Sequence, residues 1–149
     1  MAENIRKADY FYTMVSDKAG EGARILNALR DAGVNLRAFS GFPTARKSQL
    51  DFVPVDSAAL VAAAKAAKIK LKGPKTCFLV EGDDRVGAMS DVIQKLSAAK
   101  INITAVDGVS AGGGRYGAIL WVKPRDVKKA SFVLLPSSSI SIPDYQVNR

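Results

Sequence analysis

Two short polar segments of this chain could bind a small charged molecule. They are Asp17-Lys18-Ala19-Gly20 and Asp84-Arg85-Val86-Gly87. Each ends in a glycine before a predicted helix, so free backbone N–H groups and the positive end of the helix dipole would face a bound carboxylate. The glycine allows close approach because it has no Cβ. Asp17 and Asp84 could pair with an ammonium group, or they could simply cap the two helices.

A pair of asparagines stands at equivalent places after these segments, Asn35 and Asn102. An amide side chain both donates and accepts hydrogen bonds, which suits the ammonium and carboxylate groups of an amino acid together. The same side chains could instead bond to local backbone. Lys18 and Arg85 could meet a ligand carboxylate or remain solvated.

The composition excludes several catalytic chemistries. Among 149 residues there are no histidines and one cysteine, so there is no Ser-His-Asp or Cys-His pair, no His-ligated metal and no site with several thiolates. Cys77 lies in an apolar run and is interpreted as a small buried hydrophobic residue. The remaining nucleophiles and bases form no recognisable constellation. We therefore expect no enzyme, no metal site and no cofactor.

The chain aligns with itself at an offset of 67 residues, without a gap, from residues 17–55 onto 84–122. Eight of these 39 positions are identical. Apolar residues coincide where identity is lost, for example Ile25 with Val92. An ordered self-match of this kind indicates a duplicated structural unit.

Each copy predicts the same order of elements from its apolar periodicity. In the first copy these are a strand over 10–15, a helix around Ile25 and Leu29, strands from 34 and over 49–55, a helix over 58–67 and a strand over 69–71. In the second they are a strand over 76–80, a helix around Val92 and Leu96, strands from 101 and over 117–122, and a helix over 124–130. Residues 131–135 could be a last helical turn or a fourth strand.

The order β-α-β-β-α-β predicts an α+β fold of two ferredoxin-like modules, with antiparallel sheets and helices packed on one face. We place the modules at residues 1–72 and 73–135. The tail, 136–149, could be disordered, or its alternating residues 140–143 could pair with a partner. Gly33 is predicted to end the first helix in a left-handed conformation. Because Lys100 takes that place in the second copy, we expect a different cap there.

The motifs resemble those of ACT domains, a family of regulatory domains that bind amino acids. The resemblance rests on Asp84-Arg85-Val86-Gly87 followed by a helix and Ala99-Lys100-Ile101-Asn102-Ile103, and on the matching residues of the first copy. The family pattern has a proline where this chain has Ala19 and Val86. The resemblance covers roughly residues 8–130.

The resemblance implies a non-catalytic regulatory protein that binds an amino acid or a similar small ligand at interfaces between ACT-like modules. It also implies a homodimer, with modules paired side by side, and a regulated partner enzyme. The implied ligand-binding residues are Asp17, Lys18, Ala19, Gly20, Glu21, Asn35, Leu36, Asp84, Arg85, Val86, Gly87, Ala88, Asn102 and Ile103.

Two other functions stay open. One is a ligand-independent dimerisation or interaction module that regulates a partner enzyme by contact. The other is nucleic-acid binding, which the net charge of +8 suggests. The charge is spread over both copies, and an RNA-binding sheet would need exposed aromatic residues on its central strands, where only residues 10–12 qualify. We expect this function less.

Three further patterns carry no function in our interpretation. Residues 112–117 match G-x-G-x-x-G, but they lie between two predicted strands, so we expect a hairpin and no dinucleotide site. The five lysines between 65 and 75 are expected to be solvated. The N-terminus has no apolar segment typical of a secretory signal, and no apolar run would span a membrane, so we expect a cytoplasmic protein.

Overall fold

The computed structural model describes residues 3–136 of the chain, which divides into two compact units. The N-terminal unit is Ala8–Thr76, and the C-terminal unit combines Met1–Lys7 with Cys77–Arg149. This division differs from the predicted modules of 1–72 and 73–135, since residues 3–7 belong to the second unit and residues 73–76 to the first. The predicted tail alternatives for 137–149 lie outside the described residues.

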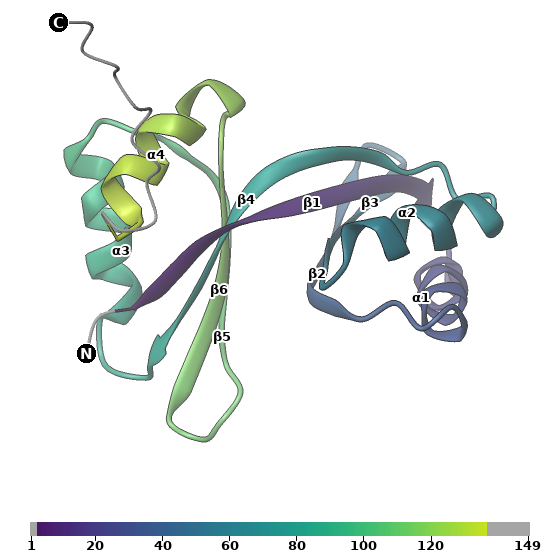
Figure 1. Cartoon of the computed structure of the whole chain (residues 1–149), viewed down its shortest axis with the longest axis horizontal. Helices are drawn as coiled ribbons and strands as arrows, with labels where there is room; N and C mark the ends of the chain where they lie inside the picture. Colours follow the sequence, from purple (N-terminus) through teal and green to yellow (C-terminus); the bar gives the residue numbers. More distant parts are fainter. Residues whose placement is uncertain (1–2, 137–149) are drawn as a thin grey trace, which may run out of the picture. The chain divides into compact units, whose positions relative to one another are not determined.

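The N-terminal unit contains two helices and four strands (Figure 1). Its sheet has the order β2-β3-β1-β4, and β3 pairs antiparallel with both β1 and β2. The elements are β1 (Asn4–Ser16, from residue 8 in this unit), α1 (Glu21–Asp31), β2 (Leu36–Thr44), β3 (Lys47–Pro54), α2 (Ser57–Ala66) and the start of β4 (Lys72–Asp83).

The predicted fourth strand at 69–71 is wrong, because β4 begins at Lys72. Lys68 takes a left-handed conformation, φ 57°, after α2. The next residue, Ile69, uses its N–H to close the helix end on the Ala64 carbonyl at 2.8 Å. Ile69 and Leu71 pack against the core of the unit. Their alternation therefore reflects the chain leaving the helix layer and not strand pairing.

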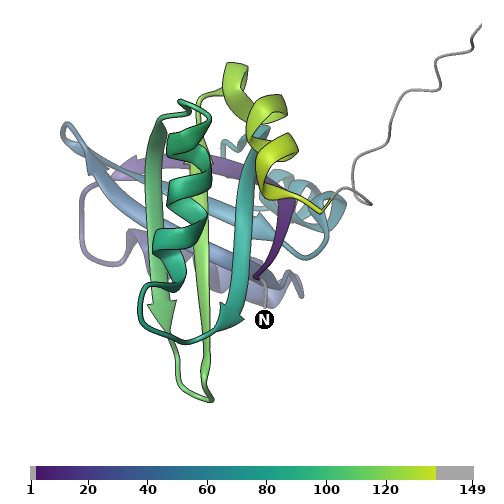
Figure 2. The same ribbon diagram turned by 90° about the vertical axis from the view of Figure 1, so that its left-hand side faces the viewer.

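The C-terminal unit repeats the arrangement, with the strand order β1-β4-β6-β5. Figure 2 shows helices on one face of its strands. After β4 come α3 (Ala88–Ala98), β5 (Ile103–Ser110), β6 (Arg115–Val122), the short helix η1 (Pro124–Asp126) and α4 (Val127–Leu134). Residues 131–134, left open between helix and strand, are helical.

The fourth strand of the C-terminal unit comes from the start of the chain. Residues 4–7 of β1 lie beside β4, where Asn4 Nδ2 donates to Glu81 Oε1 at 3.0 Å. Ile5 is buried in the core of this unit, with Phe78 and Val92 among its members. The predicted fold of two βαββαβ modules is confirmed, and the second module is completed by a segment from the other end of the chain.

The two cores use equivalent residues. Ile25 and Leu29 of α1 are buried in the N-terminal unit, and Val92 and Leu96 of α3 are buried in the C-terminal unit. These helical positions were predicted from apolar spacing. Burying apolar side chains stabilises the folded state by about 25 cal/mol per Å² of surface removed from water, and this is the main favourable contribution to folding.

The predicted difference between the two helix caps is wrong. Gly33 is left-handed, φ 74°, and Lys100 adopts the same conformation, φ 59°. The N–H of the following residue then bonds to the helix in both copies, Val34 to the Leu29 carbonyl and Ile101 to the Leu96 carbonyl, each at 2.9 Å. The hydrogen bonds of the cap therefore impose the left-handed conformation on a residue that does not favour it.

Candidate ligand-binding site

The first candidate segment forms the turn between β1 and α1. Gly20 starts the helix in a left-handed conformation, φ 91°, and no side chain caps the helix. A Cβ at Gly20 would meet no atom within 4 Å, so the backbone conformation requires the glycine and the space beside it is open. Ser48 Oγ donates to Asp17 Oδ1 at 3.2 Å, which ties the turn to the start of β3.

The second candidate segment has the same design between β4 and α3. Gly87 is left-handed, φ 76°, without a side-chain cap, and it too has open space where a Cβ would be. Ser110 Oγ donates to Asp84 Oδ2 at 2.6 Å, and the Asp84 N–H donates to the Gly114 carbonyl at 2.8 Å. Helix capping by the two aspartates is therefore wrong, because both hold the turn against a neighbouring strand or hairpin.

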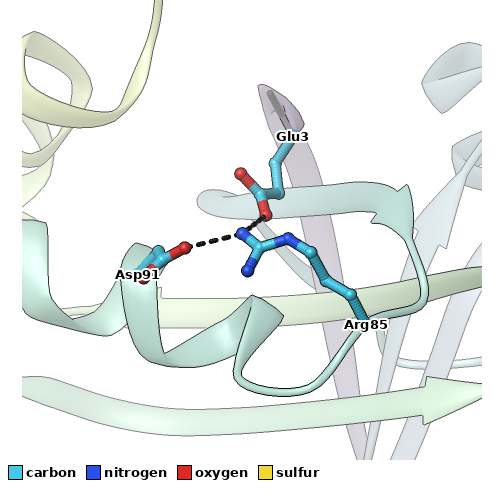
Figure 3. A network of polar contacts seen from close by, with 3 residues as sticks. All are labelled: Glu3, Arg85 and Asp91. Carbon is cyan, nitrogen blue, oxygen red and sulfur yellow. Dashed lines mark hydrogen bonds and ion pairs between the residues drawn. The ribbon is translucent and has the colours of Figure 1, made fainter. Parts of the chain in front are cut away.

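Arg85 is the residue that most distinguishes the two segments (Figure 3). Its Nη2 donates to Glu3 Oε1 at 3.0 Å and to Asp91 Oδ2 at 2.6 Å. The hydrogen bond to Asp91 is the first cause that raises the pKa of Arg85, and Glu3 adds to it. Lys18, at the equivalent place, has no ion pair in the described part of the chain. Arg85 is thus held between two carboxylates.

Tyr116 lies beside this network, and its hydroxyl is buried without a hydrogen-bond partner. A Cβ on Gly82 would stand 3.0 Å from Tyr116 Cε1 and 3.2 Å from Glu3 Cγ, so the three residues are closely packed. Burial raises the pKa of Tyr116, and the charge of Glu3 raises it further, while Arg85 lowers it. No pattern in the sequence indicated Glu3, Asp91 or Tyr116, because these residues come together only when the N-terminal strand joins this unit.

Asn35 lines a surface hollow of about 440 Å³ in the N-terminal unit. Its own Oδ1 accepts the Leu36 N–H at 3.0 Å, so the local backbone bond left open by the sequence is present. Most of the residues that line the hollow are apolar, and together they are Leu26, Leu29, Arg30, Gly33, Val34, Asn35 and Leu36. In the C-terminal unit Asn102 is exposed and Ile103 packs against the core.

The predicted residues do not meet within one unit. Residues 17–20 precede α1, whereas Asn35 follows it, and the helix of 11 residues between them is about 16 Å long at 1.5 Å per residue. The same separation holds for 84–87 and Asn102 across α3. A single small amino acid cannot contact both groups of one unit.

The other predicted residues surround the two turns. Lys18, Ala19 and Val86 are exposed, whereas Ala88, at the start of α3, is buried in the core of the C-terminal unit. Glu21, half-buried, forms an ion pair with Arg24 at 3.0 Å in the first turn of α1. These contacts leave the turns accessible, with the helix starts facing open space.

Sequence comparison finds no matching family model and no matching curated protein. Solved structures match over most of the chain. Protein BT0572 from Bacteroides thetaiotaomicron aligns with a TM-score of 0.75 over 87% of this chain and 88% of its own, at 18% identity. The ligand-free regulatory subunit of aspartate kinase from Thermus thermophilus aligns with a TM-score of 0.59 over 90% and 95%, at 15% identity. The chain has the fold of a tandem ACT-domain protein.

A structure of aspartokinase alpha and beta subunits gives a TM-score of 0.57 over 90% of this chain and 95% of its own, at 18% identity. The resemblance to tandem ACT domains is thus confirmed for the fold. At these sequence identities the structural match shows that the helices and strands are arranged in the same way, and it does not show which ligand this chain binds.

The ACT-like units also bear on the other sequence patterns. Gly112, Gly113 and Gly114 all have positive φ in the turn between β5 and β6, so the G-x-G-x-x-G match forms the expected hairpin.

The aromatic ring of Tyr12 is covered by the ammonium groups of Lys72 and Lys75, which lie 5.9 and 5.1 Å from the ring centroid. These ammonium groups occupy the ring surface on which a nucleic-acid base would stack. Within residues 3–136 there is neither a cluster of three metal-ligating side chains nor a helix able to span a membrane.

Proposed function

We propose that this chain is a non-catalytic regulatory protein that binds an amino acid or a similar small zwitterion at interfaces between ACT-like modules. The observation that carries the proposal is the pair of equivalent turns. Each starts a helix with a left-handed glycine, has open space beside that glycine, and is held by an Asp–Ser hydrogen bond. The positive end of the helix dipole at each start suits a carboxylate, which would share or replace the bonds that the Glu21 and Ala88 N–H groups make to the Lys18 and Arg85 carbonyls.

The separation of each turn from its asparagine supports binding between modules. Since α1 keeps residues 17–20 about 16 Å from Asn35, a ligand that touches both kinds of group needs a turn from one module and an asparagine from another. A homodimer in the cytoplasm would supply this arrangement. The output would pass to a partner enzyme. Support for this comes from the similar fold of the Thermus thermophilus protein, which is a regulatory subunit of aspartate kinase.

Thermal unfolding with each of the twenty amino acids tests the proposal. We expect at least one to raise Tm, since a ligand that binds only the folded state stabilises it. Asn35→Ala and Asn102→Ala should remove the shift together, whereas Asn27→Ala, on the exposed side of α1, should keep it. Light scattering of the same samples should give the mass of a dimer. No shift with any amino acid would refute ligand binding.

One observation favours the ligand-independent alternative for the C-terminal unit. Arg85 is already bound by Glu3 and Asp91, so a ligand carboxylate would have to compete with two side chains for it. If the C-terminal turn serves only as a structural contact, Gly87→Ala will leave every ligand-induced Tm shift intact, whereas Gly20→Ala, at the equivalent position of the N-terminal turn, will abolish it.

A further inference from the structure

The outer surface of η1 and α4 carries an exposed basic stripe, defined here as Arg125 of η1 with Lys128, Lys129 and Phe132 of α4. These positions have the spacing i, i+3, i+4 and i+7, which places them on one side of a helix. All four are exposed, and Phe132 retains 73% of its surface. The opposite side of α4 contributes Ala130 and Leu134 to the core.

The internal repeat shows that the fold does not need this stripe. At the offset of 67 residues, η1 and α4 correspond to α2, and the equivalent buried pairs are Ala63 with Ala130 and Ala64 with Ser131. The four positions equivalent to the basic stripe are also exposed in α2, but there they are Ala58, Val61, Ala62 and Lys65. The same structural positions thus carry one cation in α2, against three cations and an aromatic ring in the C-terminal unit.

The charges of the basic stripe oppose helix stability. Like charges at i, i+3 and i, i+4 repel, and cations in the first turn of a helix oppose its dipole. Asp126, at the N-cap of α4, complements the dipole, but no acidic residue lies in the first turn itself. Within residues 3–136, none of the three cations has an ion pair. Three cations without ion pairs beside an exposed aromatic ring point to a role outside the unit.

We propose that the basic stripe docks an acidic helical segment of a partner protein. The stripe is two turns long, which matches the face of one packed helix. Carboxylates of the partner would pair with Arg125, Lys128 and Lys129, and an apolar recess between them would take Phe132, since arginine and aromatic side chains dominate protein interfaces. A nucleic acid would need further stacking rings, and a membrane a longer apolar face; the stripe has one ring on two turns.

This inference rests on the proposed function, because it assigns the surface through which a regulatory chain would reach its partner. It can nevertheless fail separately. None of the residues of the basic stripe belongs to the turns at 17–20 and 84–87 or to the asparagines, so substitutions in the stripe should leave the amino-acid-induced Tm shift unchanged.

The test uses the full chain and a fluorescent synthetic peptide of about fifteen residues, with leucine along one helical face and glutamate beside it. Binding is followed by anisotropy. We expect R125E/K128E/K129E and, separately, Phe132→Ala to weaken Kd at least about tenfold. The matched control is K65E/K68E/K70E, which changes the net charge equally at exposed lysines of the N-terminal unit. It should change Kd less than about threefold.

Two parallel titrations use a single-stranded oligonucleotide and vesicles of anionic lipid. Neither should depend on the basic stripe more than on the control lysines. Equal losses of peptide binding in the two triple variants, no effect of Phe132→Ala, or stripe-dependent binding of oligonucleotide or vesicles in place of peptide would each overturn the proposal. Circular dichroism of every variant confirms that α4 still folds.

Discussion

Arg85 Nη2 donates to Glu3 Oε1 at 3.0 Å, although the two residues are 82 positions apart in the chain. The contact links the turn before α3 to the N-terminal end of β1 (Figure 3). Glu3 keeps only 10% of its side-chain surface exposed, and Arg85 supplies the cation that pairs with this largely buried carboxylate. The turn that we propose as a ligand site is therefore also one of the attachments of the edge strand.

Arg85→Ala should loosen the N-terminal strand. Without the guanidinium, Glu3 is left as an unpaired and mostly buried carboxylate, which favours detachment of residues 4–7. Hydrogen exchange should show faster exchange of these amides than in the parent chain. Arg115→Ala removes an exposed ion pair to Asp83 and serves as the control. Equal protection of residues 4–7 in all three proteins would show that Arg85 does not hold the strand.

Lys100→Gly should stabilise the protein by about 1 kcal/mol, because glycine pays no steric penalty in the left-handed conformation. The reciprocal change, Gly33→Ala, should destabilise it by about the same amount. Urea unfolding measures both. The pair tests the cap directly, since Gly33 and Lys100 make equivalent hydrogen bonds. A neutral Lys100→Gly alongside a costly Gly33→Ala would contradict the explanation.

Asp51→Asn should make the protein more stable at neutral pH. Asp51 is 4% exposed in β3; burial raises its pKa above 3.8, while the hydrogen bond from Gln49 and the charge of Lys75 lower it. When the folded state raises the pKa of a carboxyl, the free energy of unfolding falls as pH rises from the unfolded pKa through the folded pKa, because the folded state must then hold a buried charge. The gain of Asp51→Asn should therefore grow above pH 3.8 and disappear in more acidic solution, as urea unfolding across pH would show. Asp9→Asn, which removes the same charge at an exposed position, is the matched control.

Tyr116→Phe should not destabilise the protein, and we expect a gain of about 1 kcal/mol, because the lost hydroxyl is buried without a hydrogen bond. Burial raises the pKa of Tyr116 above 10.0. The free energy of unfolding therefore falls as pH rises above 10, because the unfolded chain loses the phenol proton more readily than the folded protein does. The variant should show a smaller alkaline loss than the parent. A clear loss of stability at neutral pH would mean that the hydroxyl has a partner in solution.

The repeat and the cores could be predicted from the sequence because they depend on local spacing. Ile25 with Leu29, and Val92 with Leu96, recur at helical intervals and are buried as expected. The two glycines of the candidate turns were found for the same reason, since a left-handed residue before a helix strongly favours glycine.

Features set by contacts between distant residues could not be predicted. The contact between Glu3 and Arg85 requires residues 4–7 to pair with β4. The local sequence of neither strand indicates which strand it will pair with. Lys100 is left-handed because hydrogen bonds after α3 require it, against the preference of lysine. The candidate site was located at its turns, but its asparagines proved to lie at the far ends of α1 and α3.

The placement of residues 4–7 beside β4 separates the order of synthesis from the order of assembly. The strand that completes the C-terminal unit is synthesised before its partner β4, which is made about 70 residues later. At 5–20 residues per second, that is a delay of roughly 4 to 14 s. During this time Ile5 has no core to enter, so folding of the two units cannot proceed simply from one end of the chain to the other.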